Sequence, residues 1–183
     1  MSEIILHHYP ASPFSEKVRL TLGLKGLAWR AVEQPTIMPK PELVPLTGGY
    51  RKIPVMQIGA DVYCDSQCIV RELERRRPTP TVHPGASEAT SWAFAFWSDR
   101  VLFQASVAVI FGQMADQVPA EFIEDRSKLM GGQRFDPVQM KAAVPLMKES
   151  LRAQLAWLDA QLGDGRAFLI GRASCRERVY GTV

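Results

Sequence analysis

Residues 52–66 read KIPVMQIGADVYCDS, and this stretch decides the fold. Two short runs of strand-forming residues, Ile53–Ile58 and Asp61–Cys64, flank Gly59-Ala60, which predicts a tight hairpin. Asp65-Ser66 follows at once, and both residue types cap helix N-termini. The apolar residues after them recur at helical spacing as far as Pro78. The stretch therefore predicts a strand, a second strand and a helix in that order.

The residues before this hairpin predict a strand, a helix and another strand. The segment Ile4–Tyr9 begins with an apolar run that favours a buried strand. Ser12-Pro13 is typical of a helix start, because serine caps free N–H groups and proline at the first helical position lacks one. Gly26 favours the end of that helix, and Trp29–Glu33 predicts the next strand. Residues 35–50 are rich in proline and glycine, which predicts an irregular connection with one helical turn.

After residue 77 the pattern becomes helical only. Three prolines within residues 78–85 predict a linker between domains. Apolar residues between Trp92 and Ile110 follow a helical period. Val138–Leu162 predicts a second long helix, in which Pro145 introduces a kink. We therefore expect a small α/β domain at 1–77, a linker at 78–87, an incomplete helical domain at 88–171 and a separate tail at 172–183.

The composition is that of an ordinary globular protein and excludes several classes. A content of 46% hydrophobic and 22% charged residues excludes intrinsic disorder. The longest apolar stretch, Val101–Phe111, is far shorter than the ~20 residues that a membrane span needs. The net charge is +3, and the last twelve residues, with three arginines and one glutamate, contribute +2 of it, so we expect no nucleic-acid partner. Three cysteines cannot form a disulfide framework and three histidines follow no metal-binding pattern, so we expect a cytoplasmic protein without a metal site or membrane contact.

Three short motifs in a fixed order carry a resemblance to a known family. They are Ser12-Pro13-Phe14-Ser15 with Lys17-Val18-Arg19, then Lys52-Ile53-Pro54-Val55, then Asp65-Ser66, followed much later by Ala167-Phe168-Leu169-Ile170-Gly171. With these motifs the chain resembles the cytosolic glutathione transferase superfamily, in a bacterial form with serine in the active site. The resemblance implies an α/β thioredoxin-like N-terminal domain followed by an all-α helical C-terminal domain. It also implies glutathione as co-substrate and a homodimer.

Ser12 is the candidate catalytic residue. A thiol becomes a nucleophile when it ionises, and a helix N-terminus or a hydrogen-bond donor lowers its pKa. Ser12 can offer both to glutathione; in the tau class of the family the matching serine has this role, and in the omega class a cysteine takes the position. Helix capping alone is the other explanation for Ser12, while Ser15 and Tyr9 are alternative hydroxyl donors. No Cys-x-x-Cys motif begins this helix, which disfavours thiol–disulfide exchange.

The other two motifs are the candidate glutathione-binding residues. X-Pro bonds are mostly trans, but the equivalent of Pro54 is cis in this superfamily. The resemblance therefore implies that Ile53 pairs its backbone with glutathione as an added strand would. It implies that Lys52 holds the glycyl carboxylate, although a plain surface lysine explains that residue equally well. By the same resemblance Asp65 and Ser66 hold the γ-glutamyl ammonium and carboxylate groups, or they simply cap the helix.

The remaining candidates are weaker. The hydrophobic electrophile is expected to contact four residues of the helical domain: Trp92, Phe96, Phe103 and Met114. Aromatic residues at helical spacing are more often core residues, and Trp97 and Trp157 are expected in the core. Cys64 and Cys68 are interpreted as small buried residues rather than reactive thiols. Gln67 is a further candidate contact for glutathione.

The last residues depart from the family pattern. Residues 170–179 read IGRASCRERV, which places arginines and a cysteine where a buried helix needs apolar residues. This stretch resembles one reading frame of a sequencing-adapter oligonucleotide. Our hypothesis is that the native gene is interrupted near residue 170, so that residues 172–183 are not native and apolar faces of the helices stay uncovered. An unusual natural C-terminus is the alternative.

The function that the resemblance implies is transfer of glutathione to small hydrophobic electrophiles, as in detoxification. Glutathione-dependent isomerisation or peroxide reduction is an alternative within enzymes. A non-catalytic transferase-like module that binds a protein partner is the alternative outside them.

Overall fold

The computed structural model describes residues 3–83, 88–132, 134–165 and 169. These residues form two compact units that divide between Val82 and His83, a point that lies within the segment 78–87 predicted as a linker. The predicted tail at 172–183 lies outside the described residues.

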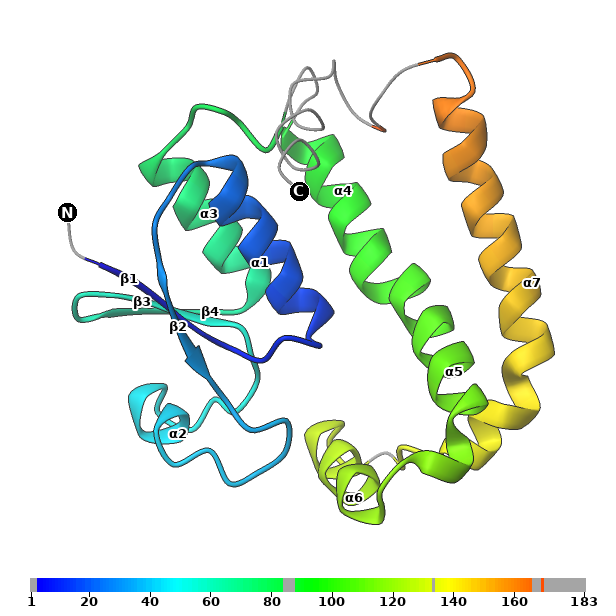
Figure 1. Ribbon diagram of the computed structural model, residues 1–183. Coiled ribbons are helices and arrows are strands. Elements are labelled where there is room, and N and C mark those ends of the chain that lie inside the picture. The colour runs from blue at the N-terminus through cyan, green and yellow to red at the C-terminus, as the bar shows by residue number, and fades with distance from the viewer. Residues whose placement is uncertain (1–2, 84–87, 133, 166–168, 170–183) are drawn as a thin grey trace. The chain divides into compact units, whose positions relative to one another are not determined.

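The N-terminal unit is a four-stranded mixed sheet with helices on both faces (Figure 1). Its strands are β1 (Ile4–His8), β2 (Arg30–Glu33), β3 (Val55–Ile58) and β4 (Asp61–Cys64), in the spatial order β2-β1-β3-β4. Strands β1 and β2 are parallel, and the other two pairs are antiparallel. Helices α1 (Pro13–Leu24) and α3 (Ser66–Arg76) cover one face, and the short α2 (Leu43–Leu46) lies on the other. This is the thioredoxin-like arrangement that the sequence predicted.

A closed apolar core holds this unit together. Strands β1 and β3 alternate, so that Leu6 and Met56 point to the same face and are fully buried. Helix α1 contributes Val18 and Leu22 to the cluster, and α3 contributes residues at the same helical spacing. The buried members of the cluster are Ile4, Leu6, Val18, Leu22, Met56, Ile58, Ile69 and Leu73. The sheet and both helices therefore owe their positions to one shared core.

A buried ion pair fixes the end of α3 and the segment after it. The Lys25 side chain is fully buried, and its Nζ donates to Glu74 Oε2 at 2.5 Å and to the carbonyls of Arg77 at 2.6 Å and Pro80 at 3.0 Å. Burial raises the pKa of the Glu74 carboxyl, but hydrogen bonds from Lys25, Thr81 and the Val82 amide outweigh it, so the net pKa lies below its ordinary value. Every donor of the buried ammonium is thus used.

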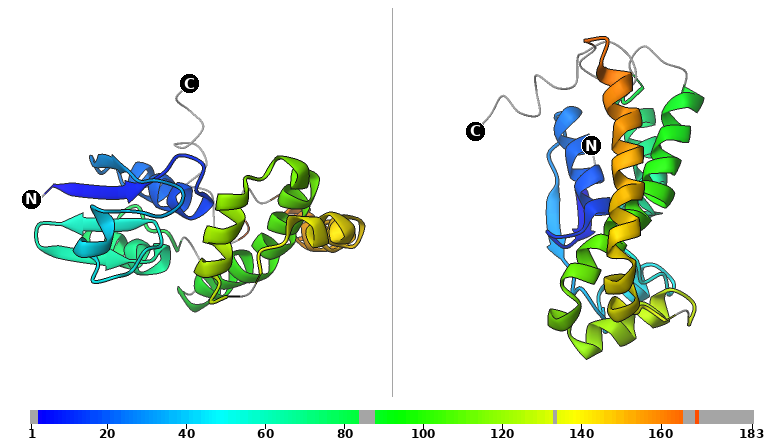
Figure 2. Two further views of the ribbon diagram at one scale, coloured as in Figure 1. Left: turned by 90° about the horizontal axis from the view of Figure 1, so that it is seen from below. Right: turned by 90° about the vertical axis from the view of Figure 1, so that its right-hand side faces the viewer.

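The second unit is helical. It contains α4 (Glu88–Trp97), a π-helical turn (Ser98–Leu102), α5 (Phe103–Gln113), a 3₁₀ turn (Ala115–Gln117), α6 (Ala120–Leu129) and α7 (Pro137–Leu162). Helix α7 continues through Pro145, and Asp136 caps its start. Helices α5 and α7 pack side by side (Figure 2). The sequence predicted the two long helical segments and missed α6.

Two features hold the helical unit together. At Gly112 the backbones of α5 and α7 approach so closely that a Cβ would lie 2.6 Å from the Val144 side chain and 2.7 Å from the Met140 carbonyl oxygen. Phe111, Phe122 and Phe135 form an aromatic cluster, with ring centroids 5.0 to 6.1 Å apart. Such edge-to-face and offset pairs contribute beyond the area that they bury.

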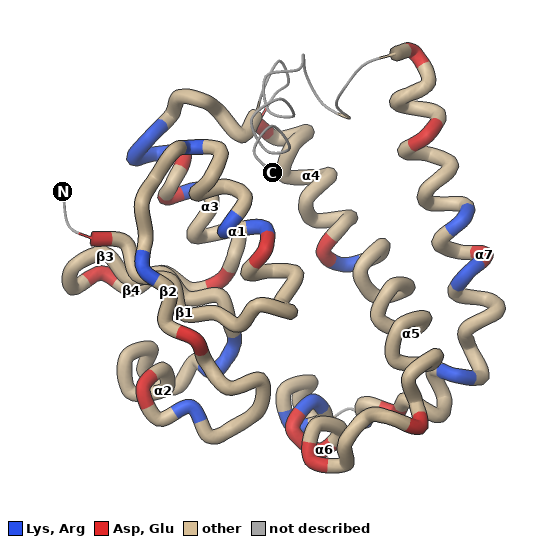
Figure 3. The backbone as a smooth tube through the Cα atoms, in the orientation of Figure 1, with Lys and Arg blue, Asp and Glu red and all other residues tan. Residues whose placement is uncertain are grey.

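The segment Glu88–Gln113 is apolar and largely uncovered. By length and composition it is able to cross a membrane, with a mean hydropathy of 1.3 over a window that is 6% buried. The prediction from the sequence was limited to Val101–Phe111 and did not include this longer segment. One such helix is weak evidence, because a core helix of a soluble protein passes the same test. Asp99 and Arg100 lie near its middle (Figure 3), where charges in a bilayer are most costly.

Neither tryptophan that was expected in the helical core is buried, and Trp97 is half-buried. Trp157 was predicted to be a core residue, but 63% of its surface is exposed. Its ring contacts Trp97 at a centroid distance of 6.4 Å, on a face of α7 that other described residues leave open. Helical spacing identifies the face of a helix but not what covers that face.

The close contact at Gly112 predicts a large effect of a single methyl group. We expect Gly112→Ala to destabilise the helical unit by about 1–3 kcal/mol, because backbone atoms of α7 must shift to admit the Cβ. Gly23→Ala in α1 is the matched control: no atom lies within 4 Å of its Cβ position, so alanine is expected to be neutral or stabilising by about 0.4–1 kcal/mol. Urea unfolding of both variants measures the difference, and equal effects would contradict the packing argument.

Lys25 predicts an equally strong effect in the N-terminal unit. We expect Lys25→Met to lower the free energy of unfolding by about 3–5 kcal/mol, since it leaves Glu74 and two carbonyls without their donor. The exposed pair Arg30–Glu3 provides the control, and Arg30→Ala is expected to change the free energy by less than about 1 kcal/mol. Denaturant unfolding at low and high salt checks both values. A Lys25 variant as stable as the Arg30 variant would show that the buried pair adds nothing.

Candidate active site

The sheet register brings the three predicted motifs to one end of the sheet. His7 of β1 pairs with Val55 of β3, and Val55 pairs in turn with Cys64 of β4. The residues just before Val55 therefore run between the loop that follows β1 and the residues that follow β4. If the same register is continued past Val55, Ile53-Pro54 lies between the loop that leads to Ser12 and the Asp65-Ser66 pair.

Ser12 is both a helix cap and a hydroxyl with unused capacity. It is the N-cap of α1 in an extended conformation, and its Oγ accepts a hydrogen bond from the Ser15 amide at 3.2 Å. Its own amide donates to the Tyr9 carbonyl at 3.1 Å, which fixes the turn before the helix. A hydroxyl that accepts one bond still has a proton to donate. Capping and donation to a ligand are therefore compatible at Ser12.

The alternative hydroxyls are placed differently. Ser15 is fully buried, and no hydrogen-bond partner of its Oγ is found in the described part of the chain. Ser12 is itself only 3% exposed, so burial does not separate the two serines. Ser15 is the weaker alternative because it lies within α1, whereas Ser12 is the N-cap of that helix. Tyr9 lies in the turn before α1, and its ring stacks under the Lys40 ammonium at 5.9 Å. Ser12 remains the hydroxyl at the helix start itself.

Asp65 and Ser66 begin α3 in the same way. Asp65 is the N-cap, and one carboxylate oxygen, Oδ1, accepts from the amides of Gln67 at 2.8 Å and Cys68 at 3.0 Å. The Ser66 side chain is buried, and its Oγ accepts from Lys17 Nζ at 3.5 Å. This contact links α1 to α3 and places a cation beside the second helix start. Capping occupies Oδ1 of Asp65 and leaves Oδ2 out of the cap.

The residues of the central motif differ in exposure. Lys52 is exposed, Ile53 is partly exposed and Pro54 is buried. The Ile53-Pro54 peptide bond is cis, as the family resemblance implied and as the statistics of X-Pro bonds did not. The backbone of Ile53 thus precedes a buried proline at the sheet end shared with Ser12 and Asp65.

Two cations near this loop had no functional role predicted from the sequence, although Arg19 belongs to the motif that carries the family resemblance. Lys40 is only 3% exposed, and it reaches the Tyr9 ring from the irregular segment before α2. Arg19 of α1 donates to the carbonyls of Tyr9 and Pro10 in this loop. A buried lysine in a proline-rich segment leaves no periodic signal, so Lys40 was not predictable from the pattern. The spacing of Glu16 and Arg19 was visible, but it indicates only a surface ion pair.

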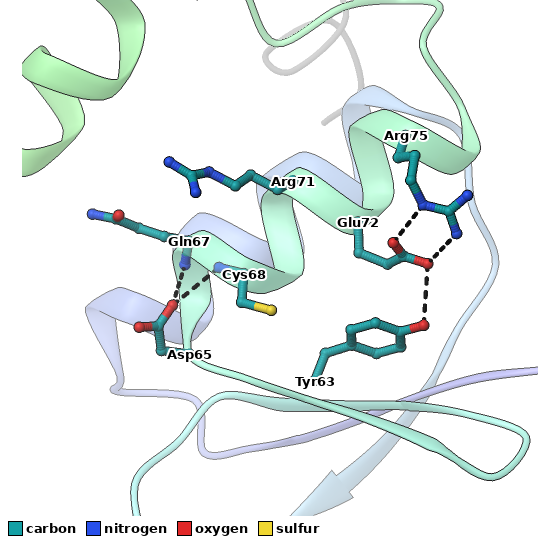
Figure 4. Close-up of a pocket in the computed structure, with 7 residues that line it drawn as sticks. All are labelled: Tyr63, Asp65, Gln67, Cys68, Arg71, Glu72 and Arg75. Atoms are coloured by element: carbon teal, nitrogen blue, oxygen red, sulfur yellow. Dashed lines mark hydrogen bonds and ion pairs between the residues drawn. The ribbon is translucent and has the colours of Figure 1, made fainter. Parts of the chain in front are cut away.

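An open pocket of about 390 Å³ lies along α3 beside Asp65 (Figure 4). Its lining comes from the end of β4 and one side of α3: Tyr63, Asp65, Gln67, Cys68, Arg71, Glu72 and Arg75. Glu72 accepts from Arg75, Arg76 and Tyr63, and these bonds, led by that of Arg75, lower the pKa of its carboxyl to about 2 against the effect of burial. This wall is therefore a fixed ion-pair network, and of the predicted site residues only Asp65 and Gln67 line it.

The interpretation of the two cysteines needs correction. Cys68 is exposed and Cys64 is half-buried, so neither is a small buried core residue. Partial burial, and then the charge of Asp65, raises the pKa of the Cys68 thiol, and partial burial raises that of Cys64 as well. Both thiols are therefore mostly protonated near neutral pH, which agrees with the prediction that they are not reactive. Among the described residues, no group of three potential metal ligands occurs.

The candidates for the electrophile pocket lie on the long helices of the second unit. Phe96 and Met114 are exposed, while Trp92 and Phe103 are half-buried. Trp92 donates from Nε1 to Glu88 at 2.9 Å, and its ring contacts His83 at a centroid distance of 5.3 Å. Phe96 and Met114 thus present apolar surface to solvent. The position of Trp92 is fixed by Glu88 and His83.

Comparison with known proteins agrees with this arrangement. Residues 6–81 match the family described as glutathione S-transferase, N-terminal domain. The chain is 41% identical to a structure described as a GST-like protein from Pseudomonas syringae, with a TM-score of 0.71. The match covers 96% of this chain and 54% of that one, so the chain spans about half the length of that protein. No curated protein matches the chain.

Other solved structures share the fold over most of their length. The tau class glutathione S-transferase MiGSTU from mango, Mangifera indica, is 20% identical, with 98% of this chain and 73% of that chain covered and a TM-score of 0.67. FzlA from C. crescentus is 25% identical, with 93% and 71% covered and a TM-score of 0.65. The fold is therefore that of glutathione transferase-like proteins. Within it, residues 6–81 match the N-terminal domain of the glutathione S-transferase family.

The two histidines of β1 predict a loss of stability in mild acid. Burial lowers the pKa of His7 and of His8 below the ordinary value of 6.5, and the Arg19 charge lowers that of His8 further. As the pH falls below about 6.5, the unfolded chain binds protons that the folded chain does not, so stability present at higher pH is lost down to the folded-state pKa. Glu72 stays ionised in this range because its pKa is about 2.

Urea unfolding at pH values between about 7.5 and 5 measures this loss. We expect the free energy of unfolding to fall over this range, and His8→Asn to flatten the dependence because an amide oxygen can still accept from Arg19 without titrating. A pH dependence that is the same in both proteins would contradict the assignment to His8.

Proposed function

We propose that the protein transfers glutathione to small hydrophobic electrophiles. The observation that carries the proposal is Ser12, whose hydroxyl caps the start of α1 as a hydrogen-bond acceptor. A hydroxyl that accepts in a cap still has a proton that it can donate to a ligand. The N–H groups of a helix start also favour negative charge. A thiol placed here gains a hydrogen bond and a favourable field in its ionised form, so its pKa falls.

Glutathione is held, in this proposal, by the residues that surround Ser12 at the sheet end. Ile53 offers its backbone N–H and C=O to the cysteinyl unit, as a strand edge does. Asp65 accepts from the γ-glutamyl ammonium with the oxygen that capping does not use, and Ser66 with Lys17 faces the neighbouring carboxylate. Lys52 binds the glycyl carboxylate. Pro54 shapes the turn that presents Ile53.

The reaction is a nucleophilic substitution or addition at an electrophilic carbon. The thiol proton leaves to solvent, the sulfur attacks with its electron pair, and a carbon–sulfur bond forms while a leaving group departs or the acceptor bond takes up the electrons. Ser12 stabilises the thiolate, and proximity supplies the rest of the rate enhancement. The electrophile lies against apolar residues of the helical domain, for which Phe96 and Met114 offer exposed surface. A cytoplasmic homodimer is part of the same proposal.

Binding of glutathione tests the first half of the proposal. We expect the thermal unfolding midpoint to rise with glutathione and to saturate, because a ligand that binds only the folded state at 100 times its Kd adds about 2.7 kcal/mol. S-methylglutathione should raise the midpoint as well, because it lacks only the ionisable thiol. A cooperative melt that neither ligand shifts would exclude the transferase and favour the protein-binding module.

A series at Ser12 separates its two roles. Ser12→Ala should lower the free energy of unfolding by about 0.5–2 kcal/mol and abolish most of the conjugation of a chlorodinitrobenzene. Ser12→Asn restores the cap without a hydroxyl, so it should recover stability but not activity. Ser12→Thr keeps both groups and should recover both.

Steady-state rates and unfolding curves for the three variants decide between the roles. Full activity in Ser12→Asn would show that the hydroxyl itself is not required, because the Asn side chain caps with its oxygen and leaves only an amide N–H as donor. Conjugation retained in Ser12→Ala as well would show that Ser12 is a cap alone and would direct attention to Tyr9. Turnover of a peroxide or an isomerisable substrate without conjugation would favour the alternative glutathione-dependent reactions.

A further inference from the structure

Arg19 of α1 contacts the end of β1 and the loop that follows it at three successive residues. Its Nη2 donates to the Pro10 carbonyl at 2.8 Å and its Nη1 to the Tyr9 carbonyl at 3.4 Å. The same Nη1 lies 2.9 Å from His8 Nδ1. A guanidinium only donates, so His8 accepts here, and its ring carries the proton on Nε2. Three consecutive residues of the chain are thus bonded to one side chain.

The Tyr9 carbonyl connects this network to Ser12. It accepts from the Ser12 amide at 3.1 Å as well as from Arg19. Arg19 itself stands on α1, the helix whose start Ser12 caps. One side chain therefore ties the end of β1, the turn and the helix together, and only 20% of that side chain is exposed.

We propose that Arg19 is a positioning residue that fixes the turn Tyr9–Ser12 and thereby holds the Ser12 hydroxyl in place for glutathione. The inference rests on the proposed function for its catalytic consequence, but the restraint on the turn does not depend on it. A planar fork with five donors suits this task, because it reaches two carbonyls and a ring nitrogen at once. Glu16 Oε2 pairs with Nε and with Nη2 of Arg19, and it orients the guanidinium from within α1. The bonds that hold the turn are made by Nη1 and Nη2 of Arg19, and Glu16 takes no part in them.

A double-mutant cycle tests the link to Ser12. We expect Arg19→Ala to reduce kcat for conjugation by about ten- to a hundredfold, since a misplacement of about 1 Å in a positioned group has effects of this size. The bound thiol, followed by the ultraviolet absorbance of the thiolate against pH, should titrate closer to its value in free glutathione. Once Ser12 is alanine, Arg19→Ala should have little further effect on either quantity, because the two changes remove the same contribution.

Two variants serve as controls. Arg152→Ala removes an arginine that pairs with a glutamate three residues earlier, as Arg19 does, but on α7; it should leave kcat and the thiol titration unchanged. Arg19→Lys keeps the charge and should restore part of the activity, because an ammonium bonds one carbonyl without the fork. If the role of Arg19 were purely structural, Arg19→Ala would lower the unfolding midpoint but would not change the pKa of the bound thiol.

Hydrogen exchange of the Ser12 amide provides a readout that needs no activity. Exchange should accelerate in Arg19→Ala and not in Arg152→Ala. If it accelerates but the wild-type protein leaves the pKa of bound glutathione unchanged, the proposed function fails and the restraint on the turn stands. If exchange is unchanged in Arg19→Ala, or if the effects of Arg19→Ala and Ser12→Ala simply add, the inference is overturned, whatever the wild-type activity.

Discussion

The antiparallel pairing of β1 with β3 is the constraint on which the rest of the N-terminal unit depends. In the observed register Leu6 lies opposite Met56, and both are fully buried. A slip by one residue would turn both side chains away from the core, so the hydrophobic pattern fixes the register. The same register sets Ile53-Pro54 against the loop that leads to Ser12. The register that buries the core is therefore also the register that brings the proposed site residues together.

The same side chains serve as helix caps and as proposed ligand contacts at this site. Ser12 and Asp65 each satisfy amides at a helix start, which restricts both positions to a few small polar residues. Each side chain has a group that the cap does not use. Ser12 has its hydroxyl proton, and Asp65 has its second carboxylate oxygen. Helix stability thus favours Ser, Thr, Asp or Asn at both positions. In the proposed function, the contact with glutathione decides which of these residues is used. This overlap explains why capping and catalysis cannot be separated from the residue type alone.

The elements with strong local signals were predictable from the sequence. The hairpin at residues 55–64 and the cap at Asp65 lie where the turn and capping residues indicated. Features that depend on tertiary contacts were not predictable: the exposure of Trp157 and Cys68, and the bonds of Arg19 to three earlier residues, follow from what lies across the fold. For the cis bond at Ile53-Pro54, only the family resemblance pointed the right way.

The two units differ in how completely they bury their apolar residues. The N-terminal unit closes a core around fully buried side chains such as Leu6 and Leu73. Of the hydrophobic residues that are buried in the described part of the chain, only Ala105 and Phe135 belong to the helical unit. The helical unit is held instead by the close approach at Gly112 and by its aromatic cluster. Because the proposed glutathione contacts all lie in the N-terminal unit, their geometry rests on the better-packed core. The residues proposed for the electrophile lie in the unit with the more open apolar surface.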